Sequence, residues 1–199
     1  MYCPLPALAV SPKQGDLDRG LQCAARAATT LEERGHTVRL YFLRHGRTVA
    51  RTEWRGNDDA RPLTREGEAS IRREAVTLAA MDVTPEIILT SPLARARRTA
   101  ELVAEALPAA GGVVEDARLA AGFSLPRLAE IVAEQGAKKA LMVVGHEPDF
   151  SATITALIGG GRLVVKKGGL ARVDVDIVDG RPQGGRLVWL LGPSQLAGE

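Results

Sequence analysis

The sequence predicts a three-layer α/β/α sandwich built on a mostly parallel, mixed β-sheet, with antiparallel strands at its C-terminal end. From residue 38 onward, short apolar runs of strand length alternate with amphipathic stretches of helix length. That alternation is typical of a sheet covered by helices on both faces. Residues 162–199 are instead rich in strand-forming residues and glycine-containing turns, which indicates hairpin strands added at a sheet edge.

Length and composition are those of one globular domain of ordinary size. The chain has 199 residues, of which 45% are hydrophobic and 25% charged, and no apolar run reaches the roughly 18 to 20 residues that a membrane span needs. The net charge is only +2, unlike the strongly basic balance of many nucleic-acid-binding proteins. We therefore expect no membrane or nucleic-acid partner, and a monomer or weak oligomer, because the fold needs no partner to close its core.

The chain is expected to divide into an N-terminal extension over residues 1–37 and one domain over residues 38–199. The extension has a proline-broken start and an alanine-rich stretch, and both a docked helix and a loose segment fit this pattern. Its start lacks the basic residues of a signal peptide. Cys3 and Cys23 lack the spacing of a disulfide framework, and both features favour a reducing, cytoplasmic location.

Local signals justify the elements of the domain. Thr64 is a good N-cap for the first helix, whose positive end is complemented by Glu66 and Glu68. Ser91 is expected to cap the second helix, with Pro92 at its first position. In chain order the expected elements are a strand over 37–43, a helix within 63–81, a strand over 86–90, a helix within 91–107, a strand over 113–115, a helix over 125–136, a strand over 140–145, a helix after residue 148, and strand-rich segments over 162–180 and 185–191.

Cationic and imidazole side chains follow three of the expected strands. The run LYFL leads into Arg44 and His45, the run EIILT leads into a helix that carries Arg95 in its first turn, and the run LMVV leads to His146. Ligands of open α/β sheets bind beyond the carboxyl ends of the strands, so we expect these side chains to share one pocket. His36, the third histidine, precedes the first strand and is expected to be a solvated surface residue.

These groups suit a phosphoryl ligand. Guanidinium groups match phosphate oxygens and stabilise the charge that spreads over them during transfer. The clustered cations disfavour protonation of His45, so its pKa should be lowered and its lone pair available for nucleophilic attack. Gly46, without a Cβ, lets the backbone approach the substrate closely. This chemistry needs no metal or cofactor, and no metal-binding pattern is visible.

Four motifs in order, FLRHGRT, ARPLTREG, TSPLARARRTAELV and VVGHEPD, resemble the histidine phosphatase superfamily, in particular its short branch typified by the phosphohistidine phosphatase SixA. The resemblance implies hydrolysis through a covalent phosphohistidine intermediate. It implies that His45 is the nucleophile, Arg44 its phosphate-binding neighbour and His146 the second histidine of the pocket. Arg61 and Arg95 match two further arginines of the family pattern. The resemblance thus implies a catalytic set of His45, His146 and Arg44, and a phosphate-binding set of Arg44, Arg61, Arg95 and His146.

Other charged residues near these motifs are less informative. Arg97 and Arg98 have no match in the family pattern; on a helix Arg97 points away from the pocket, whereas Arg98 lies on a neighbouring face and could contribute at the rim. The segment GHEPD is not a zinc-protease HExxH motif, because Phe150 replaces its second histidine. Lys166 and Lys167 lie in a glycine-rich turn without P-loop order and could contact an acidic partner.

The general acid and the substrate stay open at this stage. Larger relatives that act on sugar phosphates place a general-acid carboxylate beyond the second helix, but the comparable stretch here, ARLAAGFSLP, has none. A phosphohistidine substrate needs little or no donated proton, because imidazole leaves readily. The carboxylates near the expected pocket give no basis for choosing an acid; they are Glu115, Asp116, Asp58, Asp59 and Glu147.

The leading hypothesis is a metal-independent phosphatase that hydrolyses phosphohistidine on proteins. The modest connection over 108–139 leaves no room for a large substrate-covering subdomain, so we expect a shallow pocket that a phosphorylated side chain on a protein surface could reach. The alternatives are a phosphomonoesterase acting on a small phosphate ester, and a non-catalytic phosphate-binding module that retains the pocket.

Overall fold

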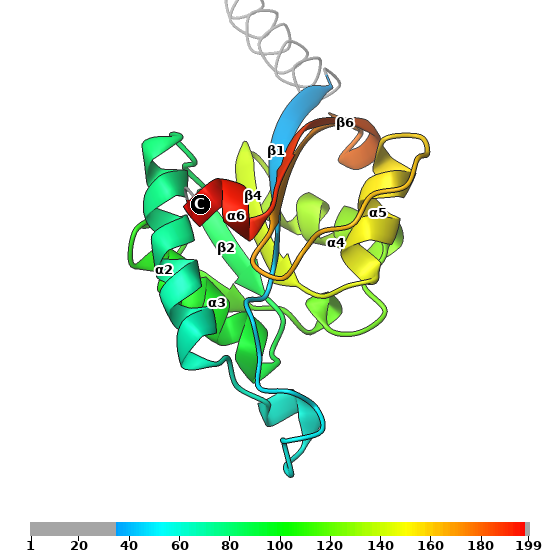
Figure 1. The fold of residues 1–199 in the computed structure, drawn as a ribbon. Helices are drawn as coiled ribbons and strands as arrows, with labels where there is room; N and C mark the ends of the chain where they lie inside the picture. Colours follow the sequence, from blue (N-terminus) through cyan, green and yellow to red (C-terminus); the bar gives the residue numbers. More distant parts are fainter. Residues whose placement is uncertain (1–34, 198–199) are drawn as a thin grey trace, which may run out of the picture. The chain divides into compact units, whose positions relative to one another are not determined.

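A computed structural model describes residues 35–197 of the chain. These residues form one six-stranded sheet in the order β3-β2-β4-β1-β5-β6, with helices on both faces (Figure 1), as the sequence predicts. In chain order the elements are β1 (His36–Arg44), the 3-10 helix η1 (Asp58–Ala60), α2 (Arg65–Ala80), β2 (Ile87–Thr90), α3 (Ala94–Ala104), β3 (Val113–Glu115), the 3-10 helix η2 (Ala117–Leu119), α4 (Leu125–Gln135), β4 (Ala140–Gly145), α5 (Asp149–Leu157), β5 (Leu170–Val178), β6 (Arg181–Leu191) and α6 (Pro193–Ala197).

The N-terminal extension falls mostly outside the described residues. Within the described part, His36 and Thr37 already belong to β1, so the first strand starts earlier than the expected domain boundary. His36 is exposed, as expected of a surface residue. Over residues 35–197, none of the helices has both the length and the apolar character needed to cross a membrane.

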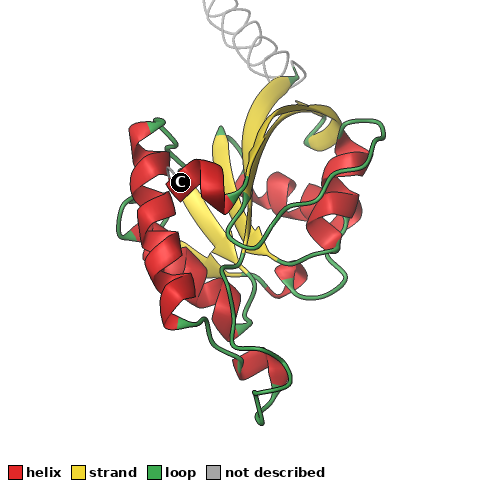
Figure 2. Cartoon of the chain, in the orientation of Figure 1, coloured by secondary structure: helices red, strands yellow, loops and turns green. Residues whose placement is uncertain are grey.

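Two apolar clusters pack on opposite faces of the sheet, and alternation along β1 feeds both. Leu40 and Phe42 belong to the cluster that includes buried residues of α4 and α5. Tyr41 and Leu43 belong to the cluster that includes residues of α2, α3 and α6. Figure 2 shows these helices as two separate layers flanking the strands. Because both faces are covered, the parallel strands are apolar on both sides, and β4 is buried at all of its positions.

Strand direction brings several segments to one edge of the sheet. β1, β2, β3 and β4 are parallel, so their carboxyl ends meet there. β5 is antiparallel to β1 and β6 is antiparallel to β5, and the pairs Leu43–Leu170 and Leu170–Leu191 place the start of β5 and the end of β6 at this same edge. The segment before β5 and the short helix α6 therefore lie close to the carboxyl ends of the parallel strands.

Two features of this edge differ from the sequence expectation. The strand expected from residue 162 begins only at Leu170, because residues 166–169 turn sharply before it. Gly168 has a φ of +78°, a conformation that favours glycine, and its N–H donates to the carbonyls of Arg44 and His45 at 3.2 and 3.1 Å. The helix α6 was not expected; Leu196, which it carries, is fully buried in the α2 and α3 layer.

Candidate active site

The structure brings the predicted histidines and arginines together at the carboxyl ends of β1, β2 and β4. The ring centroids of His45 and His146 lie 5.2 Å apart, because parallel pairing sets Arg44 at the end of β1 opposite Gly145 at the end of β4. Arg95, in the first turn of α3, interacts electrostatically with both imidazoles. The exposed fractions of His45, His146 and Arg95 are 6%, 8% and 7%, so this is a largely desolvated site.

The tautomer of His45 is set by its own backbone neighbour. Its Nδ1 lies 2.8 Å from the carbonyl oxygen of Gly46, and because a carbonyl can only accept, Nδ1 carries the proton and Nε2 carries a lone pair in the neutral ring. The Gly46 N–H donates to Oγ1 of Thr99 at 3.1 Å. A Cβ at Gly46 would lie 2.8 Å from Cγ1 of Ile71, so glycine permits this close approach of the loop to α2.

Both imidazoles are held neutral. Burial lowers the pKa of His45 to about 3, with further lowering by His146, Arg95 and Arg44 and an opposing effect of the hydrogen bond to Gly46. Burial also lowers the pKa of His146 to about 4, and Arg95 is its next cause. The predicted direction for His45 is confirmed, but the largest cause is loss of solvent rather than the cationic neighbours.

We expect neither imidazole to titrate between pH 5 and 8 in the free protein. NMR titration of the ring C–H signals, assigned with His45→Asn and His146→Asn, measures this directly. Each folded-state pKa lies below the unfolded value of 6.5, so below pH 6.5 the unfolded chain binds protons that the folded chain does not. The free energy of unfolding is therefore highest above pH 6.5 and decreases as pH falls toward 4 for His146 and 3 for His45. The slope is up to about 1.4 kcal/mol per pH unit per histidine. Urea unfolding at several pH values checks the slope; a midpoint near 6.5 for either ring would contradict the expectation.

Arg44 and Arg95 lie beside the histidine pair, and Arg61 lies beside Arg95. Nη1 of Arg44 donates to the carbonyl of Val165 at 2.9 Å, and Nη1 of Arg95 donates to the carbonyl of Asp58 at 2.8 Å. The Nε atoms of Arg44 and Arg95 are buried and have no hydrogen-bond partner in the described part of the chain. Arg61 is held by Oγ1 of Thr48 at 2.7 Å and the carbonyl of Val49 at 2.9 Å, and it lies close enough to Arg95 to lower its pKa. The site therefore presents fixed guanidinium groups beside an imidazole lone pair.

Comparison with known proteins identifies the family. The family model described as histidine phosphatase superfamily (branch 1) matches residues 40–121. An uncharacterized protein of Picosynechococcus sp. strain PCC 7002 is 36% identical over 137 residues, which is 67% of this chain and 82% of the relative. This chain belongs to the histidine phosphatase superfamily.

Solved structures place this histidine phosphatase near SixA proteins. A structure of the protein histidine phosphatase SixA complexed with tungstate has a TM-score of 0.71 at 23% identity and covers 80% of this chain and 99% of its own. A proposed phosphohistidine phosphatase SixA from Agrobacterium tumefaciens has a TM-score of 0.63 at 26% identity, with 78% and 98% covered. A mycobacterial glucosyl-3-phosphoglycerate phosphatase shares the fold at a TM-score of 0.60 and 19% identity, with 77% and 98% covered.

Asp58 organises the arginines of the phosphatase, a role that sequence reasoning missed. Its carboxylate lies 2.8 Å from Nε of Arg61, 2.9 Å from Arg51 and 3.4 Å from Nη2 of Arg95. The hydrogen bond from Arg61 is the largest cause of its lowered pKa. Asp58 is therefore ionised at neutral pH and is a poor proton donor. The three-residue spacing between Asp58 and Arg61 is the sequence signal that could have indicated this pair.

The other carboxylates near the pocket have partners of their own. Glu115 pairs with Arg97 at 2.8 Å and Asp116 pairs with Arg118 at 2.7 Å. Glu147 accepts from the Ser151 hydroxyl at 2.7 Å and from the N–H of Val165 at 3.1 Å, and Val165 is the residue whose carbonyl binds Arg44. Asp59 is exposed. None of the carboxylates considered from sequence stands out as a general acid.

Arg98 pairs with carboxylates of α2 and α3, so the rim contribution that its helix position allowed is not used. Its Nε and Nη2 both lie 3.0 Å from Glu68 of α2, and its Nη1 lies 3.2 Å from Glu101. Arg97 is paired with Glu115 on the surface, as its helix position predicts. Arg98 therefore links α3 to α2 through its hydrogen bonds to Glu68.

Ser91 is a second residue whose role the sequence did not reveal. It does not cap α3, which begins at Ala94 after the N-cap Leu93. Ser91 is fully buried, and its Oγ lies 2.9 Å from Nε2 of His146 while accepting from the N–H of Leu93 at 3.3 Å. The predicted N-cap was wrong because this hydroxyl has a tertiary partner, His146, which directly follows β4. The contact fixes the orientation of the second imidazole.

Replacing Ser91 with alanine is expected to lower kcat/KM about tenfold, because His146 loses the partner that orients its ring, in the manner of outer partners of active-site histidines. The buried ring nitrogen left unpaired should also cost about 1–3 kcal/mol of unfolding free energy. Steady-state kinetics and urea unfolding measure the two effects. Ser124→Ala, at the N-cap position of α4, where the side chain makes no capping hydrogen bond, is the control and should change neither; equal loss in both variants would contradict the assignment.

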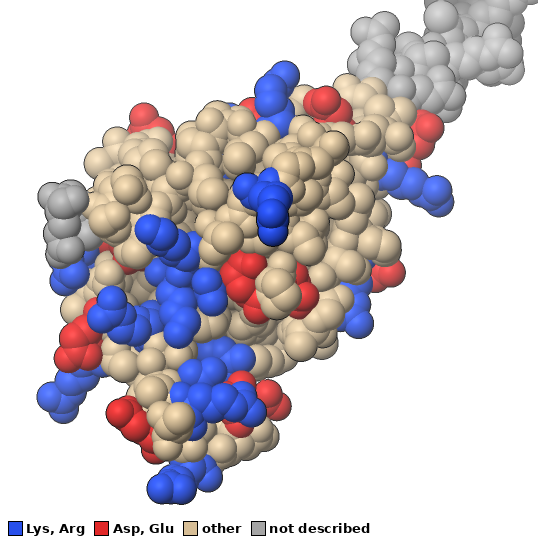
Figure 3. Space-filling view, turned by 45° about the vertical axis from the view of Figure 1, so that its right-hand side comes forward, with Lys and Arg blue, Asp and Glu red and all other residues tan. Residues whose placement is uncertain are grey.

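A positively charged surface surrounds the pocket. Lys167 interacts electrostatically with Arg44, Arg47, Arg61 and Arg95, and its pKa is lowered by burial first and by these cations next. Figure 3 shows Lys and Arg side chains gathered in a band over the lower half of one face. Over residues 35–197, no three His, Cys, Asp or Glu side chains converge where they could hold a metal ion.

Proposed function

We propose that this phosphatase hydrolyses phosphohistidine on proteins by attack of Nε2 of His45 on phosphorus. The observation that carries the proposal is the 2.8 Å hydrogen bond between Nδ1 of His45 and the Gly46 carbonyl, which directs the imidazole lone pair to Nε2. Burial and neighbouring cations keep that ring neutral. A neutral imidazole among guanidinium groups is suited to attack a phosphoryl group whose negative charge those groups bind.

Two displacement steps complete the proposed reaction. In the first, the bond from phosphorus to Nε2 of His45 forms as the substrate P–N bond breaks, and the electron pair stays on the substrate nitrogen. The other nitrogen of the substrate ring carries a proton, so a neutral imidazole leaves. The Nδ1–H bond to Gly46 stabilises the positive charge that develops on the His45 ring. In the second, water attacks phosphorus, the P–Nε2 bond breaks, and inorganic phosphate and a proton are released. The ring of His45 is restored to its starting form.

Arginine side chains and the second imidazole would bind the phosphoryl oxygens. Arg44, Arg61 and Arg95 supply permanent positive charge, and the buried Nε atoms of Arg44 and Arg95 have no hydrogen-bond partner within the described part of the chain. Nδ1 of His146 is likewise buried without a partner among the described residues. With this charge supplied by side chains, the proposed reaction is metal-independent.

The carboxylates favour a phosphoamidate over an ester. An alkoxide leaving group needs a proton donor, but Asp58 has a lowered pKa and is bound by arginines. Glu115 and Asp116 are also ion-paired. Imidazole leaves without such help. The proposal also includes a shallow pocket that a side chain on a protein surface can enter. It further includes a cytoplasmic location.

A small phosphate ester is the second candidate substrate. The observation that favours it is the shared fold with the mycobacterial glucosyl-3-phosphoglycerate phosphatase. A binding module without turnover is the third candidate, because the same guanidinium groups would hold phosphate without chemistry.

The deciding experiment compares turnover of a phosphohistidine protein with a panel of sugar and nucleotide phosphates. We expect kcat/KM for the phosphohistidine protein to be higher by orders of magnitude; the reverse ranking would transfer the proposal to the ester. Labelling of the enzyme by a phosphodonor should be acid-labile and base-stable. Absence of labelling and turnover, with phosphate binding intact, would establish the binding module instead.

A further inference from the structure

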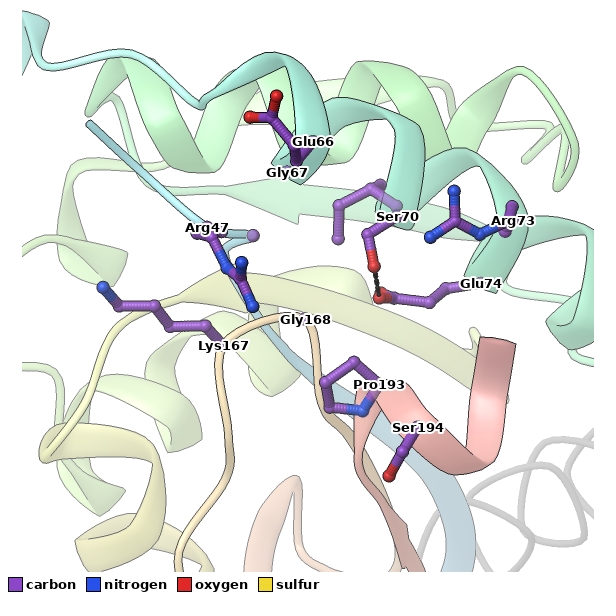
Figure 4. Close-up of a pocket in the computed structure, with 12 residues that line it drawn as sticks. Arg47, Glu66, Gly67, Ser70, Arg73, Glu74, Lys167, Gly168, Pro193 and Ser194 are labelled. Carbon is purple, nitrogen blue, oxygen red and sulfur yellow. Dashed lines mark hydrogen bonds between the residues drawn. The ribbon is translucent and has the colours of Figure 1, made fainter. Parts of the chain in front are cut away.

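A cavity of about 520 Å³ lies beside the nucleophile loop on the α2 side of the sheet (Figure 4). Its walls are the first half of α2, the segment Gly46–Arg47, the turn at Lys167–Gly168 and the start of α6. The histidines and arginines of the candidate active site are not among its lining residues. Its volume lies within the roughly 300–1,000 Å³ range of small-molecule sites.

Glu74 is a buried carboxyl in the wall of this cavity, and the proposed reaction does not use it. It is 2% exposed, its Oε1 accepts from the Ser70 hydroxyl at 2.7 Å, and its Oε2 has no hydrogen-bond partner in the described part of the chain. Burial raises the pKa of Glu74, against opposing effects of the Ser70 hydrogen bond and of Arg73, which also lines the cavity. The net shift is toward the neutral acid, which can donate a hydrogen bond. A buried polar atom without a hydrogen-bond partner is destabilising, which is a reason to expect a ligand partner.

Two cations face this carboxyl across the cavity. Arg47 and Lys167 lie on the side opposite the Ser70–Glu74 pair, and the carboxyl of Glu74 points into the space between them and α6 (Figure 4). Arg47 and Lys167 are both exposed residues, so an anion can reach them from solvent. The carboxylate of Glu66 also lines the cavity, and it limits the negative charge that a ligand of this cavity can carry.

The turn that lines the cavity is hydrogen-bonded to the backbone of the nucleophile His45. A Cβ at Gly168 would lie 2.8 Å from Oε2 of Glu74, so the Glu74 carboxyl packs against this turn. The N–H of Gly168 in turn donates to the carbonyls of Arg44 and His45. Lys167, in the same turn, interacts electrostatically with Arg44, Arg61 and Arg95. A ligand in the cavity would therefore act on the catalytic pocket through both geometry and charge.

We propose that this cavity is a second binding site, for a small hydroxycarboxylate whose carboxylate contacts Arg47 and Lys167 and whose hydroxyl oxygen accepts a hydrogen bond from Glu74. The bound anion neutralises cations that attract the substrate phosphoryl group, so it weakens substrate binding without occupying the catalytic pocket. Because both ligands bind at once, inhibition is partial and reaches a plateau.

Calorimetric titration of the full chain with malate and with succinate tests the site, with saturating tungstate present to fill the catalytic pocket. The two probes share their carboxylates, and succinate lacks the hydroxyl. We expect malate to bind about tenfold more tightly than succinate. Glu74→Leu should lower malate affinity to that of succinate, whereas Glu74→Gln, whose amide can still donate, should stay within about threefold of the wild type.

Controls separate this site from the catalytic pocket. Lys167→Gln should lower affinity for both probes, and Glu101→Gln, at an exposed carboxylate of α3, should change neither. Malate binding that tungstate abolishes, that Glu74→Leu leaves unchanged, or that is absent up to tens of millimolar would overturn the proposal. Circular dichroism confirms the fold of each variant, and the binding readout does not depend on which phosphorylated substrate the enzyme hydrolyses.

Discussion

Replacing His45 with alanine is expected to lower kcat by at least about 10⁴-fold and to abolish the phosphoenzyme, because the proposed P–Nε2 bond can no longer form. The guanidinium groups around it stay in place, since Arg44 and Arg95 are held by backbone carbonyls of Val165 and Asp58. Affinity for inorganic phosphate should therefore change by only a few fold. Rapid-quench labelling, steady-state kinetics and a phosphate binding titration measure the three quantities.

His36→Ala is the matched control, because His36 is exposed at the start of β1. It should retain full turnover and labelling. If His45→Ala kept more than about 1% of wild-type activity, or still formed an acid-labile phosphoenzyme, His45 would not be the nucleophile. Loss of labelling together with loss of phosphate binding would instead indicate that the substitution had disrupted the pocket.

Replacing Arg95 with alanine is expected to lower kcat/KM on the order of a hundredfold or more, the typical loss of one donor to a developing oxyanion. Arg95 is 7% exposed, its Nη1 is held by the Asp58 carbonyl at 2.8 Å, and its Nε has no hydrogen-bond partner among residues 35–197. Most of the loss should appear in kcat, because charge on the phosphoryl oxygens is redistributed in the transition state. Arg95→Lys should restore little, because an ammonium group lacks the planar fork.

Arg97→Ala, two residues along the same helix, controls for loss of a positive charge. Arg97 is exposed and pairs with Glu115 at 2.8 Å on the surface, so its loss should change kcat/KM less than twofold and leave the urea unfolding midpoint nearly unchanged. Equal effects of the two substitutions would mean that Arg95 acts through general electrostatics rather than by contact. Tungstate affinity, measured for both variants, provides a readout that is independent of turnover.

The order of elements and the location of the site could be predicted from sequence. Apolar runs such as residues 40–43 have strand length and both faces buried, and amphipathic helices follow them, so a covered parallel sheet is the consistent solution. Parallel strands end at one edge, so residues that directly follow them, His45 and His146 among them, must meet there. The position of Arg95 in the first turn of a helix after β2 is equally local information.

Details that depend on contacts between distant segments were decided only by the tertiary structure. Ser91 has the residue type and position of a helix N-cap, but its hydroxyl meets His146 across the strands. Asp58 was one of several candidate acids until the fold set it between Arg61 and Arg95.

The sequence by itself determined which groups reach the edge of the sheet, because strand period and chain direction are local properties. It determined that His45 should be neutral, but not that burial would be the main reason, since desolvation depends on everything packed around the ring. The tautomer of that ring, the pairing of Asp58 and the cavity beside Glu74 were decided by the tertiary structure. Each depends on distances between side chains and backbone groups that the chain fixes only when it packs.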